Sequence, residues 1–336
     1  MLNINKVFGT LAGVAYGDAF GMPVEFWSRK DIQQRFPDGI NQFLCTQKKD
    51  LHDDFRFLKK YEVTDDTLNT ILVAQLMSDK GKINSAEYIE LLNDLSKTTD
   101  ISVIAGPSTL SALKAIKSGA DIQYTGRMGT TNGALMKLSP IGILFGTEQV
   151  NELVTNVRNL CAPTHNTKTA ILASVIIARI ISLSVRTDNP EQFVQESWAI
   201  VSSTLKIPDI GGFNDCQPDV ETRLNFVQSY MKTHDKFEVF KMITNLLGTG
   251  VESIDTLIVV LVILSYTHSP IEASRIAVTL GGDTDTAASI VCSILGGLYQ
   301  IEFLDNNDVK QIESVNNIDL MSIAQKLVER EKNEII

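Results

Sequence analysis

Three apolar segments of this 336-residue chain outlast a typical β-strand and carry helical periodicity. They span residues 67–78, 170–185 and 287–299. The segment 170–185 is apolar nearly all round, with Arg179 as its only charge, so we expect it to run through the middle of the molecule. Segments 85–96 and 190–205 are amphipathic, which is typical of peripheral helices.

Glycine and proline mark the connections between these segments. Such stretches lie at 37–39, 106–107, 126–133, 207–218 and 248–250. No internal repeat, low-complexity tract or linker divides the chain, so the sequence predicts one all-α domain over residues 1–336. The number of helical segments favours an orthogonal bundle over a four-helix bundle. A chain of this length with 44% hydrophobic residues can bury a large core without disulfides.

The charge balance restricts the partners of the protein. Thirty basic and forty acidic residues give a net charge of −10, which disfavours nucleic acid and anionic membranes. An anionic ligand must therefore be held by backbone donors or by a metal. The longest uncharged apolar runs, such as 257–264, are too short to cross a bilayer, and the four cysteines show no C-x-x-C spacing. We expect a soluble, cytoplasmic protein with reduced thiols.

Glycines recur every fourth residue near the N-terminus, at Gly9, Gly13, Gly17 and Gly21. On a helix this spacing makes one flat stripe, and Asp18 within it argues against a secretory leader. Each interior helical glycine costs about 1 kcal/mol relative to alanine, so something must approach this face closely. That neighbour is either another helix or a ligand.

Two predicted helices begin with paired aspartates flanked by threonine, T-D-D-T at 64–67 and D-T-D-T at 283–286. Acidic and hydroxyl side chains are ordinary helix caps, because they accept hydrogen bonds from the unpaired N–H groups of the first turn. One such side chain suffices for a cap, however, and here each helix start carries two carboxylates.

Two adjacent carboxylates repel each other inside a packed domain unless a cation lies between them. Aspartate and threonine oxygens are ligands for hard ions such as Mg²⁺ or Mn²⁺, whereas no cysteine or histidine stands at zinc-ligand spacing. If the two helix starts converge, the sequence predicts a site for two ions. Its ligands are Thr64, Asp65, Asp66, Asp283, Asp285 and Thr286.

Three further features could belong to such a site. Glu25 lies between apolar Val24 and Phe26, and is either a solvated loop residue or a base beside the metals. The loop G-R-M-G-T-T-N-G at 126–133 is either a flexible connection or a source of backbone donors for a pyrophosphate or ribose. His165 precedes a buried helix and is either a core or capping residue or a ligand contact.

The order of these motifs resembles the ADP-ribosylglycohydrolase family, in particular its bacterial members. The matching stretches are residues 9–25, 64–67, 129–142, 164–165, 248–250 and 281–290. The resemblance implies an all-α fold of the ADP-ribosylglycohydrolase type with two Mg²⁺ or Mn²⁺ ions on the six residues above. It also implies that Gly129, Thr131, Asn132 and Gly133 line an ADP-ribose cleft, with His165 as a further contributor.

The same resemblance implies a hydrolase that reverses mono-ADP-ribosylation of a protein, with arginine as the expected acceptor. Two ions would orient the ribose and lower the pKa of water, and Glu25 or Asp285 would accept a proton. The alternative is an immunity-type or ADP-ribose-binding protein that neutralises an ADP-ribosyltransferase by direct contact. Two departures from the family are Lys137, where arginine is usual, and residues 186–245, which match no family pattern.

Overall fold

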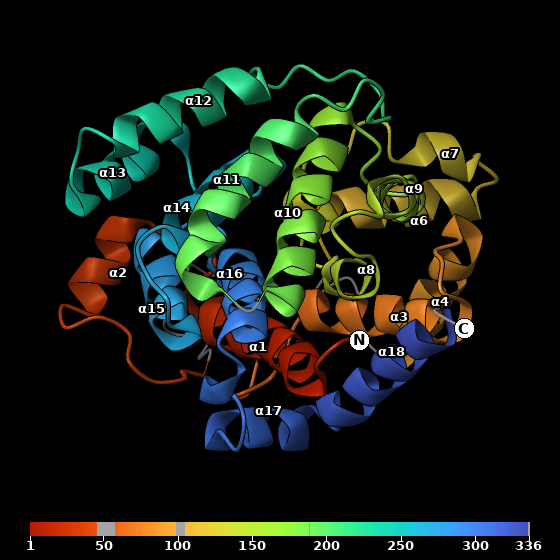
Figure 1. Cartoon of the computed structure of the whole chain (residues 1–336), viewed down its shortest axis with the longest axis horizontal. Helices are drawn as coiled ribbons and strands as arrows, with labels where there is room; N and C mark the ends of the chain where they lie inside the picture. The colour runs from red at the N-terminus through yellow and green to blue at the C-terminus, as the bar shows by residue number, and fades with distance from the viewer. Residues whose placement is uncertain (46–57, 99–104, 188, 335–336) are drawn as a thin grey trace.

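The computed structural model describes residues 1–45, 58–98, 105–187 and 189–334 (Figure 1). Within these ranges the protein is built from helices and has two isolated β-bridges but no β-strand, which confirms the all-α prediction. The helices, in chain order, are α1 Ile4–Gly21, α2 Arg29–Arg35, α3 Asp65–Lys80, α4 Ser85–Thr98, α6 Pro107–Lys117, α7 Ile122–Thr125, α8 Ser139–Leu144, α9 Val150–Cys161, α10 Lys168–Arg186, α11 Phe193–Thr204, α12 Val220–Met231, α13 Lys236–Met242, α14 Ser253–Leu264, α15 Pro270–Leu280, α16 Thr284–Leu298, α17 Asn307–Asn316 and α18 Leu320–Glu334.

The apolar segments of the sequence form the centre of the molecule. Segments 67–78 and 287–299 correspond to α3 and α16, and every residue of α16 is buried. Segment 170–185 corresponds to α10, which crosses the middle of the fold beside α16, as expected (Figure 1). The amphipathic segment 85–96 forms α4, whereas 190–205 is divided into a 3₁₀ turn at Pro190–Gln192 and α11.

Helix α10 is, in the described part of the chain, the one helix long and apolar enough to cross a membrane. Its most apolar window is 83% buried inside the protein. A helix that is apolar all round and enclosed by other helices is typical of a core helix. Burial therefore accounts for its composition.

The glycine stripe packs α1 directly against the backbone of α16. A Cβ atom on Gly13 would lie 2.2 Å from the carbonyl oxygen of Cys292, and one on Gly17 would lie 2.3 Å from that of Ala288. The neighbour that the stripe requires is thus a helix. Because the stripe ends at Gly21, whose Cβ position is 2.5 Å from Asp285 Cα, it also brings the end of α1 against the acidic start of α16.

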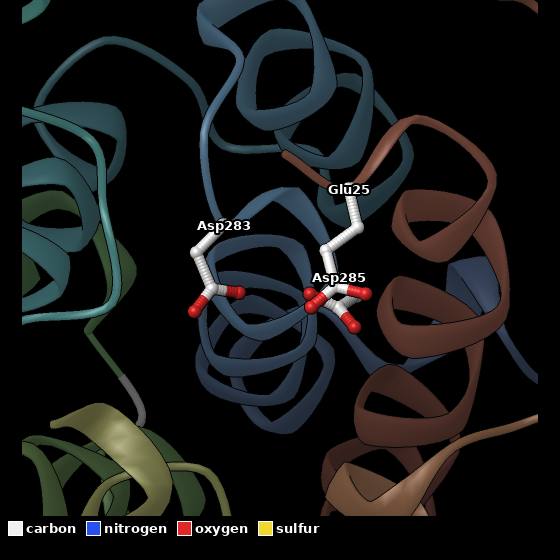
Figure 2. A group of neighbouring side chains, drawn as sticks. All are labelled: Glu25, Asp283 and Asp285. Carbon is white, nitrogen blue, oxygen red and sulfur yellow. The ribbon is translucent and has the colours of Figure 1, made fainter. Parts of the chain in front are cut away.

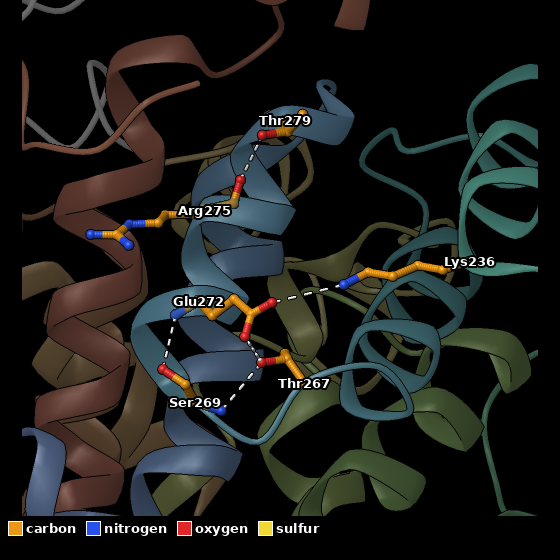
Figure 3. Close-up of polar contacts among 6 residues, drawn as sticks. All are labelled: Lys236, Thr267, Ser269, Glu272, Arg275 and Thr279. Atoms are coloured by element: carbon orange, nitrogen blue, oxygen red, sulfur yellow. Dashed lines mark hydrogen bonds and ion pairs between the residues drawn. The ribbon is translucent and has the colours of Figure 1, made fainter. Parts of the chain in front are cut away.

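Helix α15 ends four residues before α16 begins, and Figure 3 shows the polar contacts along α15. Ser269 caps α15 by accepting a hydrogen bond from the backbone N–H of Glu272, whose carboxylate accepts one from the Thr267 hydroxyl at 2.8 Å. Lys236 of α13 reaches the same carboxylate at 3.8 Å, and both side chains are exposed, so this ion pair stabilises little. The cap fixes where α15 begins.

The turn from α15 into α16 is made by Gly281 and Gly282, both with positive φ. A Cβ atom on Gly282 would lie 2.0 Å from the carbonyl oxygen of Thr249. Only glycine fits this conformation and this space. The backbone N–H of Asp283 then donates to the same Thr249 carbonyl at 2.8 Å, which fixes the N-cap residue of α16.

Candidate metal centre

The two acidic helix starts meet. The hydroxyl of Thr286, in the first turn of α16, donates to Asp66 Oδ2 in the first turn of α3 at 3.4 Å. Glu25 follows α1 and reaches the same place, since one carboxylate oxygen each from Glu25, Asp283 and Asp285 lies within 4.8 Å of the others (Figure 2). The structure therefore brings together residues more than two hundred positions apart, as the prediction of a shared site required.

Neither acidic helix start uses its N-cap residue as a cap. Twelve α-helices whose starts are described have Ser, Thr, Asp or Asn at the N-cap position. Ten of these are capped by their own N-cap side chain, namely by Asn3, Ser28, Asn84, Asp121, Thr167, Asp219, Asp235, Ser269, Asn306 and Asp319. The two exceptions are Thr64 of α3 and Asp283 of α16, which make no side-chain cap bond. Capping alone does not explain these two segments.

The carboxylates of the centre are buried close to one another. Burial raises the pKa of Asp66 well above its usual value, and the carboxylates of Asp18 and Asp65 raise that pKa further. Burial, followed by Glu25 and Asp283, likewise raises the pKa of Asp285. Each of these carboxylates would be stabilised in its charged form by a nearby cation.

Two of the buried carboxylate oxygens have no hydrogen-bond partner among the described residues. They are Asp66 Oδ1 and Asp283 Oδ1, one from each helix start. A buried carboxylate oxygen without a donor is costly, and an all-oxygen cluster with unpaired lone pairs suits a hard divalent cation. The residues present therefore fit a centre for Mg²⁺ or Mn²⁺.

The remaining predicted ligands lie at the same helix starts. Thr64 is fully buried, and its hydroxyl donates to Asp18 Oδ1 at 2.8 Å, which leaves its oxygen lone pairs available. Asp65 is half-buried at the first position of α3. The assignment of these residues as metal ligands stays a prediction, as does the number of ions.

The glycine-rich loop lies against the metal centre. The side-chain amide of Asn132 donates to Asp283 Oδ2 and to the hydroxyl of Thr256, both at 2.8 Å, and its backbone N–H donates to the Val251 carbonyl. Asn132 is buried. Its amide thus holds a predicted metal ligand, a contact that differs from the expected one with ADP-ribose.

His165 lies beneath this loop. Its Nε2 is 2.9 Å from the Thr131 hydroxyl and its Nδ1 is 2.8 Å from the Thr164 hydroxyl. A Cβ atom on Gly133 would lie 2.8 Å from the imidazole, and one on Gly129 would lie 2.1 Å from the Thr164 carbonyl. Burial lowers the pKa of His165 well below its usual value, so the ring is neutral and supports the loop. Direct ligand contact by Gly129, Thr131, Gly133 or His165 stays a prediction.

Two aromatic rings, those of Tyr124 and Phe213, lie together where the chain enters the glycine-rich loop. Tyr124, two residues before the loop, is 57% exposed, and its ring centroid lies 5.8 Å from that of Phe213. The backbone of Phe213 pairs with Asn166, which in turn donates to the Gly126 carbonyl. Sequence reasoning missed this pair because Phe213 is 89 positions from Tyr124 in the chain; the tyrosine next to a glycine-rich loop was the only signal.

The structure describes Lys137 and most of residues 186–245, the two departures from the family pattern. Lys137 is buried, with its ammonium 5.0 Å from the centroid of the Tyr88 ring, so the contact described for it is a cation–π interaction. Residues 186–245 contain α11, which lies beside α10, and α12 and α13, which lie at the upper left edge of the molecule, away from α1 and α3 (Figure 1).

Fold and site together define an all-helical protein with a buried acidic centre suited to divalent cations. A family model described as ADP-ribosylglycohydrolase matches residues 2–335. The chain belongs to the ADP-ribosylglycohydrolase family.

Its relatives include proteins without an assigned activity. The chain is 27% identical over 348 residues to the uncharacterized protein YegU of Escherichia coli K12, with all of both chains covered. It is 26% identical over 327 residues to an uncharacterized protein of Archaeoglobus fulgidus, covering 92% of this chain and 96% of the relative. A solved structure titled ADP-ribosylglycohydrolase-related protein complex matches with a TM-score of 0.70 at 19% identity, over 98% of each chain. That likeness bears out the fold.

Proposed function

We propose that this protein hydrolyses the glycosidic bond between ADP-ribose and an acceptor, and that the acceptor is an arginine of a mono-ADP-ribosylated protein. Membership of the glycohydrolase family supports the reaction class. The observation that carries the metal dependence is the pair of acidic helix starts whose N-cap residues do not cap and whose buried oxygens, Asp66 Oδ1 and Asp283 Oδ1, have no described partner.

The residues that would hold two Mg²⁺ or Mn²⁺ ions are Thr64, Asp65, Asp66, Asp283, Asp285 and Thr286. When bound, such ions supply positive charge that orients the ribose hydroxyls and makes nearby water more acidic. Glu25 and Asp285 come from different elements, and their carboxylates meet at the centre (Figure 2). In our proposal one of them accepts a proton from the attacking water as the water oxygen bonds to the anomeric carbon. The bond from that carbon to the acceptor nitrogen breaks, and the same carboxylic acid then gives its proton to this nitrogen, which restores the carboxylate.

The glycine-rich loop would bind the rest of the substrate. The backbone N–H groups of Arg127, Gly129 and Asn132 already donate to carbonyl groups of the protein. The other N–H groups of the loop would donate to the pyrophosphate, which an acidic protein cannot attract through its net charge of −10. The exposed ring of Tyr124 at the loop entrance suits stacking of the adenine base. The backbone of the loop is held by Val251 and Ser253, so the donors would be in place before substrate arrives.

The charge of the centre supports arginine as the acceptor. Six carboxylates gather there, those of Asp18, Glu25, Asp65, Asp66, Asp283 and Asp285. Two divalent ions would not fully neutralise them, and the excess negative charge favours a cationic guanidinium over a neutral serine.

A cytoplasmic location is a further prediction.

One assay tests the proposal. Release of ADP-ribose is measured from arginine-linked, serine-linked and nucleic-acid-linked substrates with Mg²⁺, Mn²⁺ or EDTA, for the wild type and for Asp283→Asn. We expect turnover of the arginine-linked substrate that needs a metal and is lost in the variant. Undiminished release in EDTA would reject the metal-dependent reaction. Transferase capture by an inactive Asp65→Ala protein, without turnover by the wild type, would favour the binding protein instead.

A further inference from the structure

Asp18 is a fully buried carboxylate of α1 that sequence reasoning did not assign to the site. It accepts from the backbone N–H of Thr64 at 3.0 and 3.1 Å and from the Thr64 hydroxyl at 2.8 Å. It also accepts from the backbone N–H and the hydroxyl of Thr67, at 3.1 and 2.5 Å. All of these donors belong to the start of α3.

These bonds give α3 the cap that its own N-cap residue does not provide. Thr64 is the N-cap of α3, and the N–H of Thr67, at the third helical position, is the group that an N-cap side chain ordinarily accepts. Here the N–H of Thr67 donates to Asp18 instead. Asp18 belongs to another helix, α1, and precedes Thr64 and Thr67 by 46 and 49 residues in the chain. Helix α12 is capped by its own N-cap residue, because Asp219 accepts hydrogen bonds from the N–H and the hydroxyl of Thr222.

A cap from another helix has a cost that a local cap avoids. Asp18 is a charge buried without a basic partner among the described residues, next to carboxylates of the same sign. A threonine cap at Thr64 would stabilise the helix start without that charge. What the remote cap adds is orientation. The Thr64 hydroxyl is turned towards Asp18 as a donor, so its lone pairs stay available, and Asp66 Oδ1 accepts no hydrogen bond from the described residues.

We propose that Asp18 is a positioning residue of the metal centre, which caps α3 from α1 so that the Thr64 hydroxyl and the Asp66 carboxylate can bind cations. This inference rests on the proposed metal dependence. Residues that hydrogen-bond to metal ligands fix their orientation, and their loss typically weakens metal binding about 10- to 100-fold.

The test compares Asp18→Asn, which replaces one of two accepting carboxylate oxygens by an amide group, with Asp219→Ala, which removes the cap from the remote helix α12. Mn²⁺ affinity is measured by calorimetry or electron paramagnetic resonance on protein shown by circular dichroism to be folded, and thermal unfolding is recorded in EDTA. We expect Asp18→Asn to weaken Mn²⁺ binding about 10- to 100-fold and Asp219→Ala to leave it unchanged. A merely structural cap predicts lower unfolding temperatures for both variants with wild-type Mn²⁺ affinity, and that result would overturn the proposal.

A second variant applies if Asp18→Asn does not fold. Thr67→Val keeps the Asp18 carboxylate and removes one hydroxyl donor to it, and it should weaken Mn²⁺ binding by less than the expected loss at Asp18. Wild-type Mn²⁺ affinity in Thr67→Val would then overturn the proposal, as would a wild-type protein that binds no Mn²⁺. Failure of ADP-ribose release with intact Mn²⁺ binding would count against the proposed reaction alone.

Discussion

Replacement of Gly17 by alanine should destabilise the protein although alanine is the better helix former. In an exposed helix the change would gain about 1 kcal/mol. Here the new Cβ would lie 2.3 Å from both the carbonyl carbon and oxygen of Ala288 and 2.5 Å from the Ser289 nitrogen. Ordinary contact begins at 3.4 Å, so α1 and α16 must separate by roughly 1 Å at this point.

The neighbouring atoms cannot yield as a side chain would, because they belong to the backbone of a buried helix. Insertion of a methyl group into a well-packed core typically costs about 1–3 kcal/mol, and a collision between two helix backbones belongs at the upper end of that range. After the gain in helix propensity we expect the free energy of unfolding to fall by about 1–2 kcal/mol. Because Asp285 lies one turn before Ala288, the same separation should also weaken Mn²⁺ binding.

Urea unfolding in EDTA and a Mn²⁺ titration measure the two effects. Gly250→Ala is the control, since a Cβ at Gly250 meets nothing within 4 Å and the residue does not have positive φ. Its stability should be unchanged or raised by a few tenths to about 1 kcal/mol. A Gly17→Ala protein as stable as the wild type would refute the argument that the stripe exists for backbone contact.

Three further outcomes are expected. Burial and neighbouring carboxylates raise the pKa of Asp66 in the folded protein, so folding takes up protons there. The wild type in EDTA should therefore gain stability relative to Asp66→Asn as the pH falls through the raised pKa towards about 4, while Mn²⁺ affinity falls. A constant difference in urea unfolding would contradict this. Asn132→Ala removes a donor to Asp283 and should weaken Mn²⁺ binding about 10-fold by calorimetry; a loss confined to ADP-ribose affinity would instead favour direct ligand contact. Tyr124→Ala should lose about 1–3 kcal/mol of ADP-ribose binding with Mn²⁺ affinity intact, and unchanged ADP-ribose affinity would exclude stacking on this ring.

The fold class followed from the sequence because helical periodicity is a local property. The segment 170–185 predicted a central helix, and α10 is one. The division of 190–205 was less visible: Pro190 begins a 3₁₀ turn before α11, and a proline at a helix start is compatible with either arrangement. The glycine stripe predicted close approach but not its partner, since the match to α16 depends on pairing across the chain.

The site followed from the sequence only where its chemistry is concentrated in short motifs. Paired carboxylates at 65–66 and at 283 and 285 indicated cation binding, and the structure brings both pairs together. Asp18 gave no such signal, because the role of a single aspartate in an apolar helix depends on which residues lie next to it in the folded protein. The family resemblance implied that Asn132 and His165 contact a ligand, while the residues alone left a core or capping role open for His165. Their described bonds go to Asp283 and Thr131, and the direction in which a side chain points cannot be predicted from a sequence pattern.

Helix α1 contacts both acidic helix starts of the centre. One face of α1 carries the glycine stripe and lies on α16, while Asp18, next to Gly17 in the chain, caps α3. Glu25 follows the same helix and completes the carboxylate group. The two acidic helix starts are therefore positioned through a common rigid element, which limits how far mutual repulsion can separate them when no cation is bound. This explains why a costly glycine stripe and a buried aspartate occur in one helix: the first sets the distance to α16 and the second fixes the start of α3.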